Sequence, residues 1–449
     1  MALTGIQILK MLPKKNCGEC KIPTCLAFAM KVAAGQMEIG ECPYVDDEVK
    51  ATIGEASAPP IRTIKIGNGD DAFVVGGETC LARHEKRFEH QTGIGVLLTT
   101  EMDEAAIGSR LDNYNKLSYE RVGVIMKPDL VAVKDLTDEA AFTSLLKTVI
   151  DKAPNANIIL MSESTANMKA ALEICSDRQP LIYAATADNY NDMAALAKDF
   201  KCPLAVKGVN LDDAVYISEE LSKAGLKDLI IDSGARTLRA AFEDNIVCRR
   251  AAINKKYKPL GFPTIAFPCE MSDDLMMEAM LSSVLVAKYA GMIILSDLQG
   301  DTLFPLFLER MNLFTDPQRP MVVEEDIYPL NGPDENSPVI ITCNFSLTYF
   351  IVSGEIEGSK VPSWLLIKDT EGLSVLTAWA AGKFGADLIA QFMKKSGIED
   401  KVKHRELLIP GYLANIKGEL EEELPDWTIT IGPREAGHIP AFLKEWKPS

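Results

Sequence analysis

The sequence lacks any apolar run near the roughly 20 residues that a membrane-spanning helix needs. It also lacks a recognisable secretory leader, because residues 1–15 contain neither a long apolar stretch nor a cleavage-like site. Both absences predict a cytoplasmic protein. Disulfide bonds are then not expected, since that compartment keeps thiols reduced.

Basic residues are in deficit. The chain has 47 Lys and Arg against 64 Asp and Glu, and its net charge is −17. A field of this sign repels nucleic acid and anionic membranes, so neither is an expected partner. A small molecule or another protein fits the charge better, although the charge can also serve solubility alone.

Proline and small residues divide the 449-residue chain, which is too long for one compact core, into three predicted domains. An Ala-Ser-Ala-Pro-Pro linker at 56–60 ends a first domain at residues 1–57, and a proline-bearing segment at 315–320 ends a second at residues 61–320. The third domain covers residues 326–449. The second opens with two β-like runs around an Asn-Gly-Asp-Asp turn, which predicts a hairpin.

The middle domain alternates short apolar runs of strand length with amphipathic stretches of helical length. The runs are 95–99, 130–135, 158–162, 181–186, 204–208, 229–234, 264–268 and 292–297. Continuous apolar strands between helices indicate a parallel sheet, and eight such units predict a (β/α)8 TIM-like barrel. A doubly wound open sheet is the alternative.

Many of these runs end in a polar residue, at the face where barrel enzymes place their active sites. The residues are Asp135, Glu163, Thr186, Lys207, Asp232 and Asp297. Strand ends also meet water and need polar residues for that reason alone. These positions therefore mark a face of the barrel without assigning it chemistry.

The last domain repeats the alternation on a smaller scale and is predicted to be a Rossmann-like α/β domain. Its expected strands are 338–344, 364–369, 407–410 and 427–431, and its expected helices are 373–384, 387–395, 413–423 and 436–446. The predicted fold is therefore α/β and multidomain, with a barrel between two smaller domains.

Four of the ten cysteines lie within the first 42 residues, and the other six are scattered as small hydrophobic residues. The four are Cys17, Cys20, Cys25 and Cys42, spaced Cys-x2-Cys-x4-Cys-x16-Cys. Thiolates this close in sequence can converge on one inorganic centre, and four of them suit a 4Fe–4S cluster. Structural zinc is the alternative, but it usually uses two Cys-x2-Cys pairs and only one is present.

This first segment resembles the cluster domain of the large (gamma) subunit of the corrinoid iron–sulfur protein. The resemblance rests on Leu-Pro-Lys-Lys-Asn-Cys-Gly-Glu-Cys at 12–20, Pro-Thr-Cys-Leu-Ala-Phe-Ala-Met at 23–30 and Glu-Cys-Pro-Tyr at 41–44. The order of cluster domain, barrel and α/β tail extends it over essentially the whole chain. That family belongs to the carbon monoxide dehydrogenase/acetyl-CoA synthase, or reductive acetyl-CoA, pathway of anaerobic organisms.

The resemblance implies a methyl carrier more than a stand-alone catalyst. Its C-terminal domain would bind a cobamide whose Co(I) accepts a methyl group from methyltetrahydrofolate, through a separate methyltransferase, for delivery to acetyl-CoA synthase. The 4Fe–4S cluster would reduce Co(II) back to Co(I). A small (beta) barrel subunit would complete a heterodimer.

Histidine is scarce, with four residues at 84, 90, 404 and 438. None has an aspartate two residues before it, so the Asp-x-His-x-x-Gly cobalt-ligand motif is absent. This matches the base-off state without a protein histidine ligand that the resemblance implies.

The predicted cobamide contacts are the loops after the strands of the last domain, because open α/β sheets bind ligands there. They are Thr342, Asn344, Ser346, Thr348, Thr370, Glu371, Gly372, Leu373, Ser374, Gly411, Tyr412, Gly432, Pro433, Ala436 and Gly437. Helix capping and turn formation explain the same residue types equally well.

Two further hypotheses stay open. The barrel itself could bind a pterin through Asp232 or Asp297 and catalyse methyl transfer. Alternatively, the chain could be an electron carrier whose barrel is a scaffold.

Overall fold

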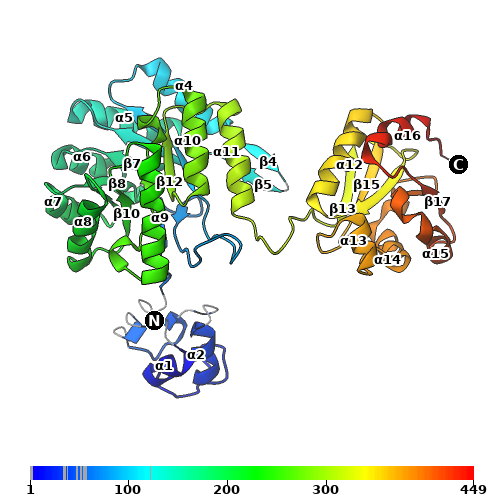
Figure 1. Cartoon of the computed structure of the whole chain (residues 1–449), viewed down its shortest axis with the longest axis horizontal. Coiled ribbons are helices and arrows are strands. Elements are labelled where there is room, and N and C mark those ends of the chain that lie inside the picture. Colours follow the sequence, from blue (N-terminus) through cyan, green and yellow to red (C-terminus); the bar gives the residue numbers. More distant parts are fainter. Residues whose placement is uncertain are drawn as a thin grey trace. The chain divides into compact units, whose positions relative to one another are not determined.

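The computed structural model describes residues 4–33, 37, 39–46, 49–50, 53, 58–121 and 123–448. The chain divides into two compact units, Met1–Ser118 with Lys127–Phe314, and Tyr119–Met126 with Thr315–Ser449 (Figure 1). Residues 54–57, where the predicted first domain ends and its linker begins, lie outside the described residues.

The N-terminal segment forms a small helical core. It contains α1 (Gly5–Met11), α2 (Cys25–Ala33) and the 3-10 turn η1 (Ile39–Glu41). A capping box starts α1, in which the Thr4 hydroxyl accepts from the Gln7 N–H and the Gln7 side chain accepts from the Thr4 N–H. Ile8, Phe28 and Val32 are buried together between the two long helices.

The barrel is formed by eight parallel strands in the order β10-β9-β8-β7-β6-β3-β12-β11. They are β3 (Gly93–Thr99), β6 (Leu130–Lys134), β7 (Asn157–Met161), β8 (Leu181–Ala185), β9 (Leu204–Lys207), β10 (Leu229–Asp232), β11 (Ile265–Ala266) and β12 (Met292–Leu295). A parallel bridge between Ile231 and Thr264 brings the two outer strands together and nearly closes the ring. The predicted barrel, with its eight strand positions, is confirmed.

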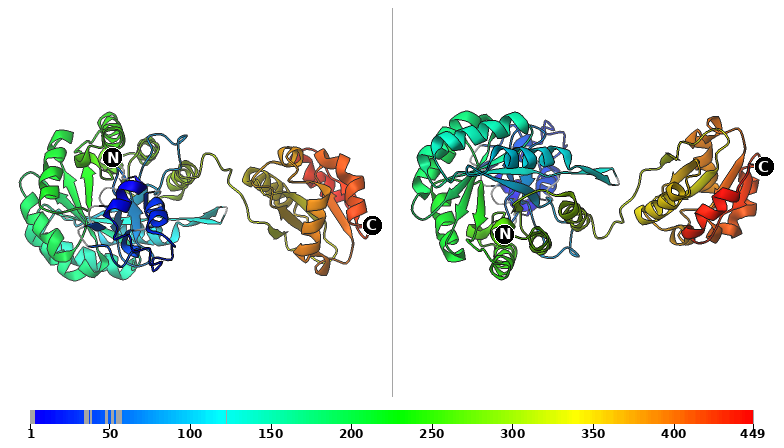
Figure 2. Two further views of the ribbon diagram at one scale, coloured as in Figure 1. Left: turned by 90° about the horizontal axis from the view of Figure 1, so that it is seen from below. Right: turned by 90° about the horizontal axis from the view of Figure 1, so that it is seen from above.

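Helices surround the strands as an outer ring (Figure 2). They are α4 (Glu104–Lys116), α5 (Glu139–Lys152), α6 (Thr165–Cys175), α7 (Tyr190–Phe200), α8 (Leu211–Lys223), α9 (Leu238–Lys255), α10 (Leu275–Ala287) and α11 (Gly300–Leu313), with the 3-10 turns η2 (Ser176–Arg178), η3 (Lys258–Leu260) and η4 (Pro268–Glu270). Several begin at a side-chain cap, as where Asp138 accepts from the Ala141 N–H at 2.8 Å. Strands such as β7 are buried at every position because helices cover them outside and side chains fill the interior.

The predicted hairpin before the barrel is also confirmed. Strands β1 (Ile64–Ile66) and β2 (Phe73–Val75) pair antiparallel around the turn between them. A second hairpin, β4 (Tyr119–Arg121) with β5 (Val124–Met126), was not predicted. It belongs to the second unit, where the Arg121 guanidinium lies 4.4 Å from the centre of the Phe350 ring.

The second unit is built on a five-stranded sheet in the order β13-β15-β14-β16-β17. The strands are β13 (Asp326–Leu330), β14 (Val339–Cys343), β15 (Ser363–Lys368), β16 (Glu406–Ile409) and β17 (Thr428–Ile431). Four run parallel at the predicted positions, and β13 adds an antiparallel edge that sequence did not predict. The strand order reverses between β14 and β16, because the chain leaves β14 for β15 on one side and returns to β16 on the other.

Two separate apolar clusters cover the two faces of this sheet. The helices are α12 (Ser346–Ser359), α13 (Val375–Ala380), α14 (Ala386–Ser396), α15 (Lys417–Glu423) and α16 (Ile439–Glu445), with the 3-10 turns η5 (Ile398–Asp400), η6 (Gly411–Ile416) and η7 (Ala436–His438). Ile356 of α12 and Leu443 of α16 pack on one face, while Ala378, Ile389 and Leu420 of α13, α14 and α15 pack on the other (Figure 1). Sequence reasoning missed α12.

A search of the described helices for a stretch long and apolar enough to cross a bilayer finds none.

Candidate functional site

Three of the four N-terminal cysteines border one apolar core. Cys42 is buried in it, Cys20 and Cys25 pack against it half-buried, and Cys17 is exposed. Helix α2 begins at Cys25, so that the apolar Phe28 and its neighbours follow this thiol directly. The local fold therefore places three of the four sulfurs at the edge of a water-excluding cluster.

Backbone and side-chain groups around Cys25 fix the loop that carries the first thiols. The Asn16 side chain accepts from the Cys25 N–H at 2.8 Å, and the Asn16 N–H donates to the Cys25 Sγ at 3.4 Å. An N–H donor to sulfur favours a thiolate ligand and tunes the potential of a bound cluster.

The Tyr44 side chain contacts two residues of the loop that carries the first thiols. Its hydroxyl donates to Glu19 Oε1 at 2.6 Å, and the Lys15 ammonium lies 3.7 Å from the ring centre. The hydrogen bond to Glu19 raises the pKa of Tyr44, and the nearby Cys17 and Cys42 sulfurs add to that shift. Tyr44 thus lies beside the first and last thiols of the motif.

The donor set fits an iron–sulfur cluster by its chemistry: four cysteines, an N–H donor to one sulfur and an adjoining apolar core. Across the described residues, no three His, Cys, Asp or Glu side chains are close enough to hold a single metal ion. Four thiols within one small segment suit a multi-atom cluster by their chemistry, and their role as its ligands stays a prediction.

The second unit contains an apolar cavity of about 190 Å³ at the carboxyl ends of β14 and β16, where the strand order reverses. This is the position where open α/β sheets bind their ligands. Helices α12 and α16 form the outer wall, and the loops after β16 and β17 form the rim.

Six of the fifteen predicted cobamide contacts line this cavity. They are Thr342, Thr348, Tyr412, Gly432, Pro433 and Ala436. Gly411 adjoins the rim, since its N–H donates to the Pro433 carbonyl at 3.2 Å. A side chain at Gly411 would place its Cβ 2.5 Å from the Gly432 carbonyl oxygen, so the two loops approach as closely as glycine allows.

Most of the other predicted contacts lie in the turn after β15, which does not line the cavity. Asn344 is buried and holds this turn: its Oδ1 accepts from the Thr370 N–H, the Thr370 hydroxyl and the Gly372 N–H at 3.0, 2.9 and 3.0 Å. Its amide donates to Asp369 Oδ1 at 2.8 Å. Asn344 and Thr370 are therefore committed to positioning the turn, and direct cofactor contact by either residue stays a prediction.

The remaining predicted positions lie in or beside this turn, on α12 or beyond the rim. Glu371 and Ser374 belong to the turn, and Leu373 packs on the core of the sheet. Ser346 is buried at the start of α12, and Gly437 lies in η7. None of the five lines the cavity.

Sequence reasoning missed most of the cavity wall. The missed residues are Ile340, Ile341, Ile351, Val352, Val375, Leu408, Ile409, Pro410, Arg434, Ile439, Phe442 and Leu443. Their apolar periodicity predicts burial, but it does not separate burial against the sheet from burial around a ligand. Arg434 was detectable only as a cation beside the Gly432-Pro433 turn.

Two polar groups mark the rim. The Tyr412 hydroxyl donates to Glu435 Oε1 at 2.7 Å. This hydrogen bond raises the pKa of Tyr412, and the nearby Arg434 cation opposes the shift. Tyr412 therefore spans the loops after β16 and β17 at the cavity entrance.

The half-buried His404 of this unit has no ring nitrogen free to bind a metal. His404 Nδ1 accepts from the Glu406 N–H at 3.2 Å, so Nε2 carries the proton and donates to the Ser337 carbonyl at 2.9 Å. Both ring nitrogens are thus occupied by the backbone.

The polar strand ends of the barrel pair mainly with one another. Arg236 donates to both oxygens of the buried Asp232 at 3.1 and 2.8 Å, and the Tyr183 hydroxyl donates to the same carboxylate at 2.6 Å. Glu270 pairs with Arg236 and with Lys134. Burial opposes ionisation of Glu270, but these two cations hold its pKa below the usual range. Asp232 thus has its hydrogen-bonding capacity committed.

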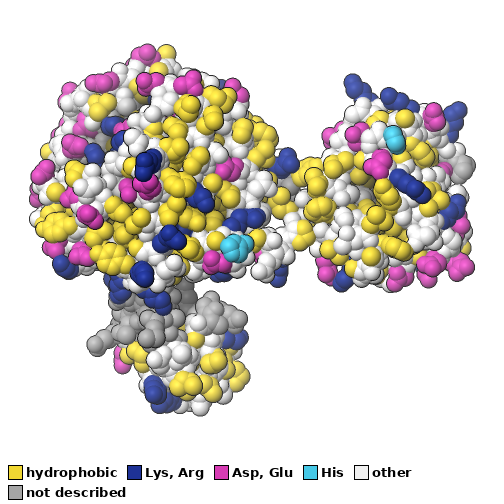
Figure 3. All heavy atoms as spheres, viewed as in Figure 1, with side chains coloured by type: hydrophobic (Ala, Val, Ile, Leu, Met, Phe, Trp, Pro, Cys, Tyr) yellow, Lys and Arg dark blue, Asp and Glu magenta, His cyan; other side chains and the backbone are white. Residues whose placement is uncertain are grey.

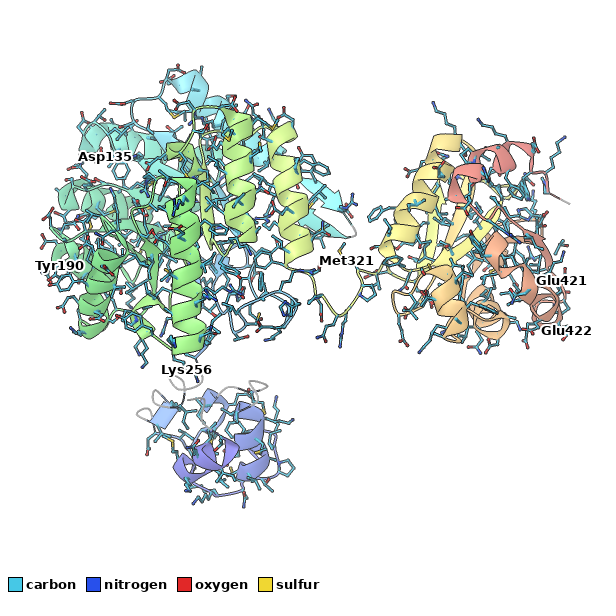
Figure 4. All side chains as sticks on the ribbon, viewed as in Figure 1. Asp135, Tyr190, Lys256, Met321, Glu421 and Glu422 are labelled. Carbon is cyan, nitrogen blue, oxygen red and sulfur yellow. The ribbon has the colours of Figure 1, made fainter. Side chains whose placement is uncertain are left out.

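Other strand ends follow the same rule. Asp135, labelled in Figure 4, accepts from the Ser162 hydroxyl and the Asn167 amide at 2.8 Å each. Asp297 accepts from the Leu298 N–H at 2.8 Å. The barrel face therefore offers mostly satisfied groups, which gives no support to the pterin hypothesis.

Comparison with known proteins covers both regions. The family model of the CO dehydrogenase/acetyl-CoA synthase delta subunit matches residues 63–443, and a model for an Fe-S cluster matches residues 12–44. A corrinoid/iron-sulfur protein large subunit of Moorella thermoacetica is 43% identical over 99% of both chains. An acetyl-CoA decarbonylase/synthase complex subunit gamma of Methanopyrus kandleri is 33% identical over 99% of this chain and 98% of its own.

Among solved structures, a dihydropteroate synthase from Anaplasma phagocytophilum covers 50% of this chain and 99% of its own, with a TM-score of 0.37 at 17% identity.

Proposed function

This chain belongs to the CO dehydrogenase/acetyl-CoA synthase delta subunit family, and from that membership we propose that it is a corrinoid- and cluster-bearing methyl carrier. The observation that carries the proposal is 43% identity to a corrinoid/iron-sulfur protein large subunit over 99% of both chains. That alignment includes both the four-cysteine segment and the cavity domain.

In this proposal, a bound cobamide would supply Co(I) as the acceptor of a methyl group from methyltetrahydrofolate, through a separate methyltransferase, for delivery to acetyl-CoA synthase, and a 4Fe–4S cluster would supply the electron that reduces Co(II) to Co(I). Cys17, Cys20, Cys25 and Cys42 would hold the cluster. The Rossmann-like second unit would hold the cobamide at the reversal between β14 and β16, where the cavity lies.

The chain's own residues support a base-off cobamide. His404 has both nitrogens engaged, and the sequence contains no Asp-x-His-x-x-Gly motif. Without a histidine donor below the metal, a lower oxidation state is favoured, because the axial ligand sets the potential. The cavity would receive the displaced lower base, which is planar and aromatic.

Arg434 lies at the rim, where the phosphodiester between corrin and lower base would pass. It is exposed, lines the cavity, and has no ion pair with any described residue. Replacing it by glutamine is expected to raise the cobamide dissociation constant roughly threefold to tenfold at low salt, because a charge-assisted hydrogen bond is lost. Titration at low and high salt measures this. Arg434→Lys keeps the charge, so its cobamide dissociation constant should rise less than that of Arg434→Gln. Equal cobamide affinity for Arg434→Gln and the parent at low salt would contradict a contact between Arg434 and the phosphodiester.

Helix α10 suggests where the small subunit of the proposed heterodimer docks. Polar residues of this helix, Glu278 and Ser282, are buried together with Leu285 and Val286, whereas the apolar Met276, Met280 and Val284 are exposed at 56%, 59% and 36%. Glu278 is satisfied inside by the N–H and hydroxyl of Ser296, at 2.6 Å each. Figure 3 shows hydrophobic side chains gathered over this part of the barrel. An uncharged, methionine-bearing face on a strongly acidic chain is typical of a protein interface.

Replacing Met280 by aspartate is expected to weaken heterodimer formation by about tenfold or more, because an unpaired carboxylate would be buried at the interface. Sedimentation of the co-expressed pair measures the dissociation constant. Val209, exposed at 85% beyond β9, gives the matched control as Val209→Asp. Equal dissociation constants for the two variants would remove α10 from the interface.

Anaerobic purification with the small subunit, followed by metal analysis and an absorption spectrum, tests the function itself. We expect about one cobalt and four irons per pair, as one cobamide and one 4Fe–4S cluster require. Iron without cobalt would favour the electron-carrier hypothesis. Zinc without iron would overturn the cluster assignment.

A further inference from the structure

The residues that line the cavity in the second unit limit which chemical groups it can bind. Its inner wall is aliphatic and aromatic, with Ile340 and Leu408 from the sheet, Val352 from α12, and Ile439, Phe442 and Leu443 from α16. These wall residues carry no charge, and Arg434, at the rim, is the charged residue among those that line the cavity.

Few hydrogen-bonding side chains face the cavity. Thr342 and Thr348 contribute hydroxyls near the strand end, and the Tyr412 hydroxyl is already bonded to Glu435 at 2.7 Å. The β14–β16 pairing covers Val339 with Leu407 and Ile340 with Leu408, while β14 pairs with β15 and β16 with β17 along their whole lengths. A group buried against α12 and α16 would therefore meet mainly carbon, since Thr348 is the one residue with a side-chain hydroxyl that these two helices contribute to the lining.

The volume of about 190 Å³ limits what can enter. A one- or two-ring aromatic group fits such a space, as an indole side chain does, whereas a corrin macrocycle does not. If a cobamide binds here, its lower base is therefore the part that enters the cavity.

We propose that the cavity selects the lower base of the cobamide, favouring a benzimidazole or a phenol over a purine. This inference rests on the proposed function. A benzimidazole presents mainly carbon, and a phenol carries its single oxygen at the link to the ribose. Adenine carries an amino group and additional ring nitrogens, and the few hydroxyls of the lining cannot replace all of their hydrogen bonds to water.

The preference is expected to reach about tenfold or more in affinity, because each buried polar group left unpaired weakens binding by roughly that factor. The full chain with its small subunit, freed of corrinoid, is titrated with 5,6-dimethylbenzimidazolyl cobamide, with adenyl cobamide and with cobinamide, which has no lower base. Dissociation constants come from the absorption change of the corrinoid. Benzimidazolyl cobamide should bind tightest.

One substitution tests whether the wall is the cause. Val352→Thr keeps the shape of the side chain and adds one hydroxyl to the α12 wall. It should therefore lower the ratio of the affinity for benzimidazolyl cobamide to that for adenyl cobamide about threefold or more. The matched control is Val247→Thr, which makes the same change on α9 at a side chain that is exposed at 46%. It should leave the affinity ratio of the two cobamides unchanged.

The outcomes separate the two proposals. Equal affinities for the two cobamides, or a preference for adenine, would overturn the selection while leaving the methyl carrier intact. Failure of cobinamide and of both cobamides to bind would overturn the proposed function, and the selection with it. Tight binding of benzimidazolyl cobamide with a narrowed ratio in Val352→Thr would support both.

Discussion

Replacing Cys42 by serine is expected to abolish the bound cluster and to leave cobamide binding unchanged. Cys42 is buried beside Ile8 and Phe28, so no water or neighbouring carboxylate can readily replace its sulfur as a ligand. Iron should fall from about four atoms per chain to below about one, since a 4Fe–4S cluster needs all four thiolates. Reactivation of oxidised cobalt should then slow by at least about tenfold.

Iron and sulfide analysis, a corrinoid titration and the rate of reactivation measure the three effects on one preparation. Cobamide affinity should survive, because the cavity lies in the other compact unit. The matched control is Cys80→Ser, at a buried barrel cysteine whose Sγ donates to the Lys86 carbonyl at 3.4 Å, a bond that serine can keep. A Cys42→Ser chain that retained four irons would refute the ligand set.

The barrel was predictable because each of its strands can be recognised as an apolar run in its own local sequence. Runs such as 158–162 are apolar throughout, which only a strand covered on both sides requires, and β7 is buried at all five positions. The four cysteines stay a predicted ligand set, although their spacing in sequence already limits how far apart they can lie.

Only some of the cavity-lining residues were predictable, because the lining combines residues at strand ends with residues on helices that are distant in sequence. Thr342 lies near the carboxyl end of β14 and Gly432 directly follows β17, and strand ends of a parallel sheet share one edge, so local sequence identifies them. Phe442 and Leu443 belong to a helix at the far end of the domain, and only the packing of α16 on the sheet brings them to that edge.

Helix α12 was missed because its pattern is weak. Its sequence Ser-Leu-Thr-Tyr-Phe-Ile-Val-Ser-Gly-Glu-Ile-Glu-Gly-Ser mixes β-branched residues and two glycines, all poor helix formers. Leu347 and Ile351 are apolar but exposed, so the spacing of apolar residues along this helix does not define a single buried face. Ser346 and Thr348 were therefore predicted as loop residues after β14, although they begin the helix that forms the cavity wall.

Replacing Asn344 by alanine is expected to cost the second unit about 3 kcal/mol of unfolding free energy, because four hydrogen bonds to a buried amide are lost together. The turn at Thr370–Leu373 would lose its anchor, while the cavity wall on α12 and α16 would keep its residues. Cobamide affinity should therefore fall more than tenfold if the turn contacts the corrin, as its position beside the predicted site suggests.

Asn344→Asp separates the two roles of this side chain. The aspartate keeps an acceptor for the Thr370 and Gly372 N–H groups but turns a donor into a carboxylate facing Asp369 Oδ1, which lies 2.8 Å from the native amide nitrogen. It should therefore destabilise the unit at neutral pH and recover as the pH falls and one carboxyl of the pair takes a proton. Thermal unfolding and corrinoid titration of both variants, each at two pH values, measure this. A loss of stability in Asn344→Ala with unchanged cobamide affinity would mean that the turn supports the fold alone, and the cofactor contacts predicted at Glu371 and Gly372 would then be wrong.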